Sequence, residues 1–192
     1  MKNKNLVLIT LLVLTMLTGS LLAGCGKSAD SNSIKIGLLN EMTGGNATFG
    51  TSAANGAKMA FKEINAKGGV LGKQLQPLKR DCQSKADEAM NLSAALVDQH
   101  IVAQIGPLTS GNVAGSTPIM MSKKVSLIAP AATAVNVTVD EKTGKTKDYI
   151  FRVCYLDSDQ AYRMADFAYD DLKVKNAAIF GSTSDDYAKG LA

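Results

Sequence analysis

The chain has 192 residues, a formal net charge of +4 and one histidine, and these features already exclude several classes of protein. Lysine and arginine are scattered without a long basic block, which argues against nucleic acid as a partner. Because His100 is the single histidine, a metal site built from several histidines is excluded, and a histidine-based catalytic triad has only this one candidate. We therefore expect no metal, no cofactor and no nucleic acid.

The first 24 residues have the three parts of a secretory signal peptide. Lys2 and Lys4 form a basic start without acids, residues 6–17 are apolar apart from threonines, and residues 22–25 read Leu-Ala-Gly-Cys. This looks like a bacterial lipoprotein signal with its lipobox, which predicts cleavage before Cys25 and lipidation of that cysteine. The alternative is a plain transmembrane anchor, but polar and small residues dilute a run barely long enough to span a bilayer. We expect an extracytoplasmic chain, anchored to the cell membrane through lipidated Cys25.

The mature chain is nearly neutral and begins with a tether. The signal removes two lysines and no acid, so the mature chain keeps 19 basic and 17 acidic residues, a net charge of +2. Residues 25–33 are small and polar after Cys25, which predicts a flexible tether. Cys82 and Cys154 remain in an oxidising compartment, where they either pair or stay as two buried thiols that act as small hydrophobes.

Strand and helix signals alternate along the rest of the chain. Apolar and β-branched runs predict strands, and apolar residues at helical spacing predict helices between them. The predicted strands cover residues 34–39, 75–81, 101–105, 125–129, 149–153 and 177–180. The predicted helices cover residues 51–67, 84–100 and 157–172, with a short one opening after the loop 106–111 and another starting near the end of the chain.

Local signals mark several boundaries of these elements. Gly68 and Gly69 end the first helix, and Ser84 with Asp87 fits a capping box for the second. Pro118 is expected to break or restart the third helix. Residues 140–148 are polar and predict a surface loop.

The alternation indicates an α/β fold with a doubly wound parallel sheet and helices on both faces. In such sheets ligands bind beyond the carboxyl ends of the strands. This rule selects five loops as candidates for a binding site: residues 40–50, 106–111, 129–133, 154–160 and 181–187.

Polar residues in these loops suit an amino-acid zwitterion. Ser110 lies between a strand and a helix, so its hydroxyl and the following N–H groups form a seat for a carboxylate. Thr133 has a similar position, the Ala131 carbonyl is an acceptor, and Asp157 is an anion suited to an ammonium group. Ordinary roles are the alternative: Ser110 and Asp157 as helix caps, and Phe49 as a core residue.

Several motifs together resemble the branched-chain amino acid binding proteins, the periplasmic binding proteins of ABC importers. The resemblance covers essentially all of residues 34–192 and is specific only when its motifs are taken together. They are Asn-Gly-Ala (55–57), Ile-Asn-Ala-Lys-Gly-Gly (64–69), Ile-Gly-Pro-Leu-Thr-Ser (105–110), Ile-Ala-Pro-Ala-Ala-Thr (128–133), Phe-Arg (151–152), Asp157 and Gln160.

The resemblance implies a two-lobed fold that closes on a small amino acid and delivers it to permease subunits of an ABC transporter. Residues 34–153 would form the first lobe and residues 154–192 the start of the second. Leucine, isoleucine or valine is the expected ligand, without any covalent step. Ligand contacts are implied for Phe49, which packs against the ligand side chain, for Tyr187 from the second lobe, and for Leu108, Thr109, Ser110, Ala131, Ala132, Thr133 and Asp157.

The chain departs from the family pattern at two places. Some relatives have a disulfide from the Cys82 position to the position of Thr109, where this chain has no cysteine. Family members are also roughly twice as long, as two complete domains require. The resemblance therefore predicts a truncated or fragmentary product that ends inside the second lobe, lacks an acidic residue supplied later in that lobe, and exposes a hydrophobic half-sheet.

The sequence bears on two alternatives to solute capture. A secreted enzyme is disfavoured, because Gly-x-Ser-x-Gly, a P-loop and a dinucleotide fingerprint are all absent. A ligand-binding sensor or receptor domain of the same fold, for amides, urea or other small solutes, is the alternative that the sequence leaves open.

Overall fold

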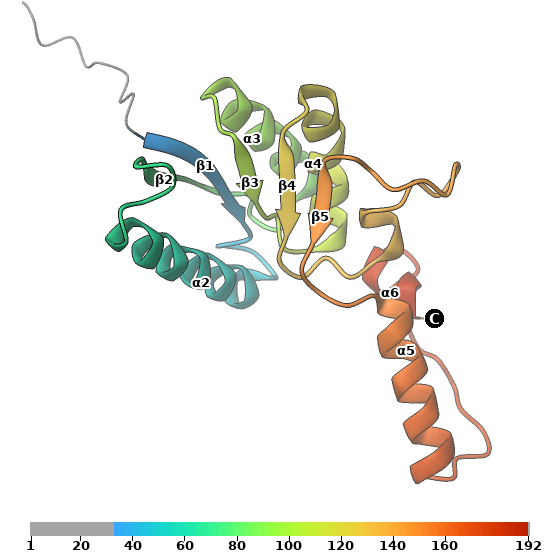
Figure 1. Cartoon of the computed structure of the whole chain (residues 1–192). Helices are drawn as coiled ribbons and strands as arrows, with labels where there is room; N and C mark the ends of the chain where they lie inside the picture. Colours follow the sequence, from blue (N-terminus) through green and yellow to red (C-terminus); the bar gives the residue numbers. More distant parts are fainter. Residues whose placement is uncertain (1–32, 192) are drawn as a thin grey trace, which may run out of the picture. The chain divides into compact units, whose positions relative to one another are not determined.

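The computed structural model describes residues 33–191, so the predicted signal peptide, Cys25 and most of the tether lie outside the described residues. The described chain forms a five-stranded sheet in the order β2-β1-β3-β4-β5 (Figure 1). The strands are β1 (Ser33–Asn40), β2 (Gln74–Asp81), β3 (Ala103–Ile105), β4 (Ser126–Ala129) and β5 (Ile150–Arg152). β1 begins at Ser33, the last residue of the predicted tether.

The strands run parallel from β1 across to β5. Gly37 pairs with Gln104, Gln104 with Leu127, and Leu127 with Ile150, all in parallel register. The predicted α/β class and its parallel sheet are therefore confirmed. The carboxyl ends of these strands meet at one edge, which brings the loops after them together.

Helices cover both faces of the sheet. Phe61 of α2 (Ala47–Ala66) packs in one cluster with Ile36 and Leu38, and Leu96 of α3 (Ala86–Asp98) packs in another with Leu39. Neighbouring strand residues point to opposite faces, so α2 and α3 lie on opposite sides of β1.

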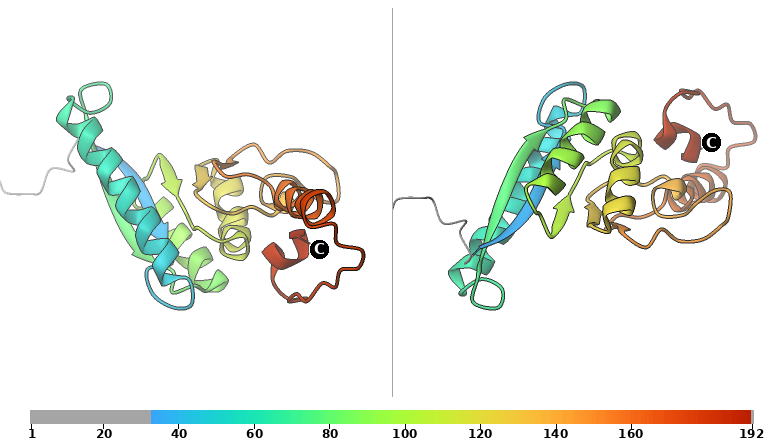
Figure 2. Two further views of the ribbon diagram at one scale, coloured as in Figure 1. Left: turned by 90° about the horizontal axis from the view of Figure 1, so that it is seen from below. Right: turned by 90° about the horizontal axis from the view of Figure 1, so that it is seen from above.

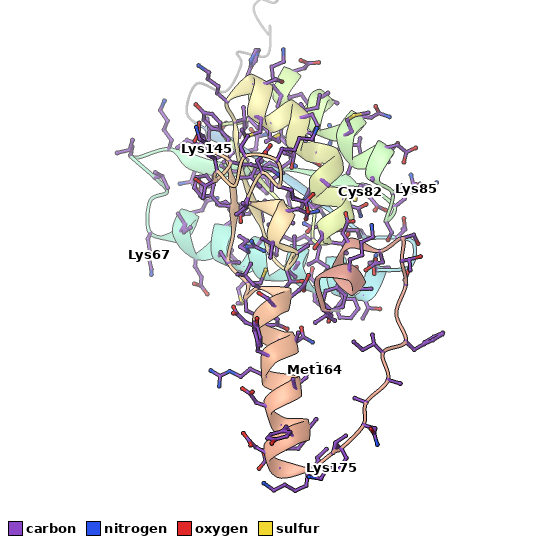
Figure 3. The ribbon with its side chains drawn as sticks, turned by 90° about the vertical axis from the view of Figure 1, so that its right-hand side faces the viewer. Lys67, Cys82, Lys85, Lys145, Met164 and Lys175 are labelled. Atoms are coloured by element: carbon purple, nitrogen blue, oxygen red, sulfur yellow. The ribbon has the colours of Figure 1, made fainter. Side chains whose placement is uncertain are left out.

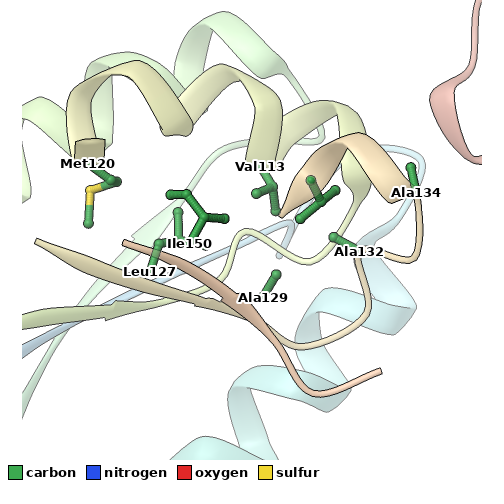
Figure 4. Packing of buried hydrophobic residues seen from close by; sticks show 8 residues of the cluster. Val113, Met120, Leu127, Ala129, Ala132, Ala134 and Ile150 are labelled. Carbon is green, nitrogen blue, oxygen red and sulfur yellow. The ribbon is translucent and has the colours of Figure 1, made fainter. Parts of the chain in front are cut away.

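A third cluster lies beneath α4 (Ser110–Lys123), on the face opposite α2 (Figure 4). Val113 and Met120 of α4 contact Leu127, Ala129 and Ile150, and all five are at most 2% exposed. Burial of each large side chain contributes about 1.5–3 kcal/mol to folding. This packing holds the first turn of α4 firmly above the carboxyl ends of β3 and β4.

The predicted break at Pro118 is wrong, because α4 runs through it without interruption. Pro118 is exposed, so its ring faces solvent. The Thr117 hydroxyl donates to the Val113 carbonyl at 2.8 Å within the same helix. Packing of the buried face outweighs the lost proline hydrogen bond.

The predicted capping box at Ser84 is also wrong. α3 begins at Ala86 after Lys85, with no side-chain cap, and Ser84 has a left-handed φ of 59°. Its Oγ instead accepts from the Asn46 N–H at 3.1 Å and donates to the Thr43 carbonyl at 3.0 Å. Ser84 thus serves the loop after β1 rather than its own helix.

The end of the chain is far less buried than the rest. It contains α5 (Asp157–Asp166), a π-helical turn η2 (Phe167–Asp171) and α6 (Asp186–Leu191), which lie at the β5 side of the sheet, away from α2 (Figures 1 and 2). Met164 lies on α5 where the helix runs away from the sheet (Figure 3). A 3-10 turn, η1 (Val135–Val137), precedes β5.

The predicted sixth strand at residues 177–180 does not form. This segment has no regular structure, Ile179 is 76% exposed, and Phe180 is fully exposed. A strand needs a neighbour for its N–H and C=O groups, and none lies beside it in the described chain. Phe151, on the edge strand β5, and Val153, just after it, are 48% and 76% exposed.

Both described cysteines are free, so the alternative in which Cys82 and Cys154 pair is wrong for this structure. Cys82 is fully buried beside Leu39 and Leu96 and packs as a small hydrophobe. Burial, followed by the Glu41 charge, raises the pKa of the Cys82 thiol to about 12.

Candidate functional site

The loops after β3 and β4 meet at the carboxyl edge of the sheet. Ser110 is the first residue of α4 and only 4% exposed, and its Oγ accepts from the Ala134 N–H at 3.2 Å. Thr109 occupies the N-cap position, so the alternative role of Ser110 as a cap is wrong. A hydroxyl also donates, so this contact leaves the Ser110 proton for an acceptor. The first N–H groups of a helix also lack intrahelical partners.

Arg152 holds the loop after β4 from the end of β5. Its guanidinium donates to the carbonyls of Thr133 at 2.9 Å and Ala134 at 2.8 Å, and to the Thr138 hydroxyl at 2.7 Å. Further contacts reach the carbonyls of Ala132 and Val135. The Arg152 guanidinium therefore holds the carbonyls of four successive residues in a tight turn. These bonds fix the position of Thr133, which is 7% exposed.

Asp157 lies next to Thr133 and carries a buried carboxylate. Its N–H donates to the Thr133 carbonyl at 3.1 Å, but neither carboxylate oxygen has a hydrogen-bond partner among the described residues. Its predicted alternative as a helix cap is wrong, because Leu156 precedes the helix and Asp159 accepts from the Leu156 N–H. Gly190 of α6 covers the carboxylate, since a Cβ there would lie 2.3 Å from Oδ2.

The environment of Asp157 makes its charged form more costly than it would be in water. Burial raises the pKa of this carboxyl, as does the Asp185 charge, whereas the nearby Thr133 side chain, which is outside hydrogen-bond geometry, and the Arg152 charge lower it only in part. A buried carboxylate without hydrogen bonds is costly. An ammonium group at this position would provide both the charge and the donors that the carboxylate lacks.

Glu41, directly after β1, is a second buried carboxylate at this edge. It is 0% exposed and accepts from the Leu108 N–H, the Thr109 N–H and the Thr109 hydroxyl, each at 2.9 Å. The Asn112 amide donates to it at 2.8 Å. Hydrogen bonds to a charged group are worth about 1.5–3 kcal/mol each, so Glu41 binds the loop after β3 tightly.

The remaining predicted site residues are divided between buried and exposed positions. Leu108 is 7% exposed and Ala132 fully buried, whereas Ala131 is exposed. Phe49 is 67% exposed on the first turn of α2, so its alternative as a core residue is wrong. Tyr187 is 41% exposed, and its hydroxyl accepts from the Gln160 amide at 3.2 Å. The structure thus joins Ser110, Thr133 and Asp157. The Tyr187 hydroxyl is hydrogen-bonded to Gln160 rather than to one of these three residues.

A metal site and a membrane-spanning helix are both absent from the described residues. Within 33–191 no three acidic, histidine or cysteine side chains are grouped so as to hold a metal ion. No helix in that range is long and apolar enough to cross a membrane. A cavity of about 300 Å³ lies between α4 and the loop 139–147, and its lining includes none of the predicted site residues.

Residues 33–192 match the family model described as periplasmic binding protein. The chain belongs to this family. It is 33% identical over 178 residues to the Leu/Ile/Val-binding protein of Escherichia coli (strain K12), covering 90% of this chain and 47% of that protein. It is 30% identical to the Leu/Ile/Val/Thr-binding protein of Salmonella typhimurium, covering 93% of this chain and 47% of that protein.

Solved structures of this family have the same fold. The branched-chain amino acid transporter substrate-binding protein LivJ of Streptococcus pneumoniae, in complex with isoleucine, matches with a TM-score of 0.76 and 34% identity over 83% of this chain and 44% of that one. The leucine-binding protein LivK of Thermotoga maritima matches with a TM-score of 0.74 and 32% identity over 82% and 43%. The chain spans about half the length of the curated relatives it matches.

Two residues that organise the site, Glu41 and Arg152, were not assigned a role from the sequence. Arg152 lies within the Phe-Arg motif, but its bonds to the loop after β4 depend on the tertiary fold. Glu41 follows an apolar strand directly. A charge at the end of a buried strand was the signal available for it, since buried charges are almost always paired.

Proposed function

We propose that this protein is the extracytoplasmic solute-binding component of an ABC importer and captures an amino acid with a branched side chain. Membership in the periplasmic binding protein family and the names of the relatives support this proposal. The observation that carries it is the contact between Ser110 Oγ and the Ala134 N–H, which joins two candidate loops at the carboxyl edge.

Ser110 and the first N–H groups of α4 receive the ligand carboxylate in this proposal. The helix dipole and unpaired N–H groups at this position favour an anion. Thr133 donates to the carboxylate or accepts from the ammonium group, and the carbonyl of Ala131 is a further acceptor. Leu108, Thr109 and Ala132 complete the wall of the seat.

Asp157 receives the ligand ammonium group, because its carboxylate is buried and lacks hydrogen bonds in the described chain. Gly190 must then move away from Oδ2 to admit the ligand. We propose that residues 154–192 begin a second lobe, so that this movement belongs to a hinge opening between lobes. Phe49 from the first lobe and Tyr187 from the second then contact the side chain of the ligand.

The partners of this protein would be permease subunits of the importer and the membrane itself. Residues 22–25, which lie outside the described residues, support anchoring through lipidated Cys25. The intact mass of the protein extracted from its native membrane tests this assignment. A mass without lipid on Cys25 would contradict it.

Calorimetric titration of the mature chain with L-leucine, L-isoleucine and L-valine tests the binding proposal. The double variant S110A/T133A should lose at least a hundredfold in affinity and keep its thermal unfolding transition. Ser122→Ala is the matched control, because Ser122 is an exposed serine of α4 that bonds only within its own helix at 2.9 Å. Unchanged affinity in the double variant would refute the assignment.

A sensor or receptor domain for amides or urea is the second candidate, kept because the same fold serves both roles. Such ligands lack the charged ammonium group that Asp157 suits. A panel that adds acetamide and urea tests the ligand class: binding of either compound in preference to all three amino acids would contradict capture of a branched-chain amino acid.

A further inference from the structure

We propose that Glu41 is a positioning residue that holds the start of α4 in its binding geometry and thereby sets ligand affinity without touching the ligand. This inference rests on the proposed function of Ser110 and the first turn of α4. It concerns a residue that lies in a different loop from Ser110, directly after β1.

Both carboxylate oxygens of Glu41 accept hydrogen bonds from the loop that leads into α4 and from its first turn. One oxygen accepts from the Leu108 N–H, and the other accepts from the N–H and the hydroxyl of Thr109 and from the Asn112 amide, at 2.8–2.9 Å. These partners lie just before and within the first turn of the helix. The carboxylate therefore determines where Ser110, between them, begins the helix.

The other side of Glu41 is anchored just as firmly. The Asp81 carboxylate accepts from the Met42 N–H at 2.9 Å and from the Thr43 hydroxyl at 2.7 Å, which fixes the chain immediately after Glu41. The first turn of α2 lies directly against the Glu41 backbone, because a Cβ at Gly50 would be 2.1 Å from the Glu41 carbonyl oxygen. Glu41 is thus a rigid link between the turn with Phe49 and the turn with Ser110.

The division of hydrogen-bond donors explains how this link assists binding. Glu41 takes the N–H groups of Leu108 and Thr109, which precede the helix, and the side-chain donors of Thr109 and Asn112. It leaves the N–H groups of the first helical residues, beginning at Ser110, which have no partner within a helix. The N–H groups at the start of α4 therefore stay available for the ligand carboxylate, and Glu41 fixes their positions before the ligand binds.

Hydrogen exchange and ligand titration of Glu41→Gln test the inference. A glutamine keeps the size but loses the charge and one acceptor, so the Leu108 and Thr109 amides should exchange at least tenfold faster in the free protein. L-leucine affinity, measured by NMR titration of the full mature chain, should fall at least tenfold. Glu63→Gln is the matched control, because Glu63 is exposed on α2 and should change neither quantity.

A double-mutant cycle separates positioning from general stability. If Glu41 acts through Ser110, the loss of affinity in E41Q/S110A should be clearly smaller than the product of the two single losses. A loss equal to that product, or unchanged affinity or exchange in E41Q, would overturn the inference. If E41Q does not fold, N112A serves instead, because it removes one bond to Glu41 and should give the same changes at smaller size.

Failure of the proposed function is distinguishable from failure of this inference. If the wild-type chain binds none of the amino acids, the proposed function fails. Amide hydrogen exchange at Leu108 and Thr109 then tests the positioning role of Glu41 separately. Faster exchange in E41Q supports this role, and unchanged exchange overturns it.

Discussion

Residues 33–153 and residues 154–191 differ sharply in burial, although strand and helix signals alternate in both. The first region contains three clusters of buried apolar side chains. In the second region Asp157 is the only buried residue, and most large apolar side chains are exposed, among them Tyr162, Phe167, Tyr169 and Ile179.

The difference shows that an apolar segment forms a strand only where adjacent strands pair with it and a helix covers it. β4 is four residues long and forms because β3 and β5 flank it and α4 covers it. Residues 177–180 have a comparable apolar pattern but no adjacent strand in the described chain. Pairing and covering, rather than local preference, decide which segment becomes a strand.

Amide hydrogen exchange should give the largest contrast between the regions. Amides in β1 and β3 should exchange on the order of 10³-fold more slowly than those of residues 177–183, because only the former require unfolding of a packed unit. Mass spectrometry of peptides from both regions measures this. In the urea-unfolded chain the difference should vanish, and protection at residues 177–183 would contradict the comparison.

Thiol modification should separate the cysteines of the two regions. Cys82 is buried and has a pKa of about 12, so at pH 8 its reaction with N-ethylmaleimide should be about 10³-fold slower than in the unfolded chain. Burial also raises the pKa of Cys154, but this residue is partly accessible and should react first. Peptide mapping over time gives both rates. Faster labelling of Cys82 than of Cys154 would show that the first region opens readily.

Matched leucine truncations compare the energetics of the regions. Leu127→Ala removes a fully buried side chain beneath α4 and should lower the free energy of unfolding by about 2–5 kcal/mol. Leu172→Ala removes a side chain that is 61% exposed and should change it by less than about 0.5 kcal/mol. Urea titration followed by circular dichroism measures both, and similar losses would mean that Leu172 is covered in solution.

Asp157→Asn should give the smallest effect, an increase in stability at neutral pH. Burial raises the pKa of Asp157 in the folded chain, so its contribution to stability is fully present below the unfolded pKa near 3.9 and is lost as the pH rises through the folded value. The variant should therefore melt a few degrees higher at pH 7, about 2–4 °C per kcal/mol. Near pH 3 it should match the wild type.

The same variant should lose amino-acid affinity, since the amide lacks the charge that holds an ammonium group. Opposite signs for stability and affinity are what a binding residue under strain produces. A variant that is less stable at pH 7 would show that the Asp157 carboxylate has partners in solution.

Part of the site followed from the sequence and part did not. The order of strands and loops placed Ser110 and Thr133 at the same edge, because parallel strands bring their carboxyl ends together. Their contact through Ala134, the hold of Arg152 on the loop after β4, and the burial of Asp157 depend on packing that no local pattern encodes. The cap predicted at Ser84 was wrong, because its side chain serves the loop after β1. Capping was only the alternative role of Ser110 and Asp157, and it fails because Ser110 bonds to Ala134 and the Asp157 carboxylate stays unbonded.

The sequence by itself determined the α/β class, the parallel sheet and the family, because hydrophobic periodicity and loop motifs are local properties that the chain carries wherever it folds. Only the tertiary structure decided that α4 continues through Pro118, that residues 177–180 remain unpaired, and that Glu41 holds the start of α4. These outcomes depend on which groups meet after folding. Burial makes an unpaired polar group costly, whereas a hydrogen-bonded one is tolerated. The hydrogen-bond partners that a residue meets after folding therefore decide its structure more than its own type does.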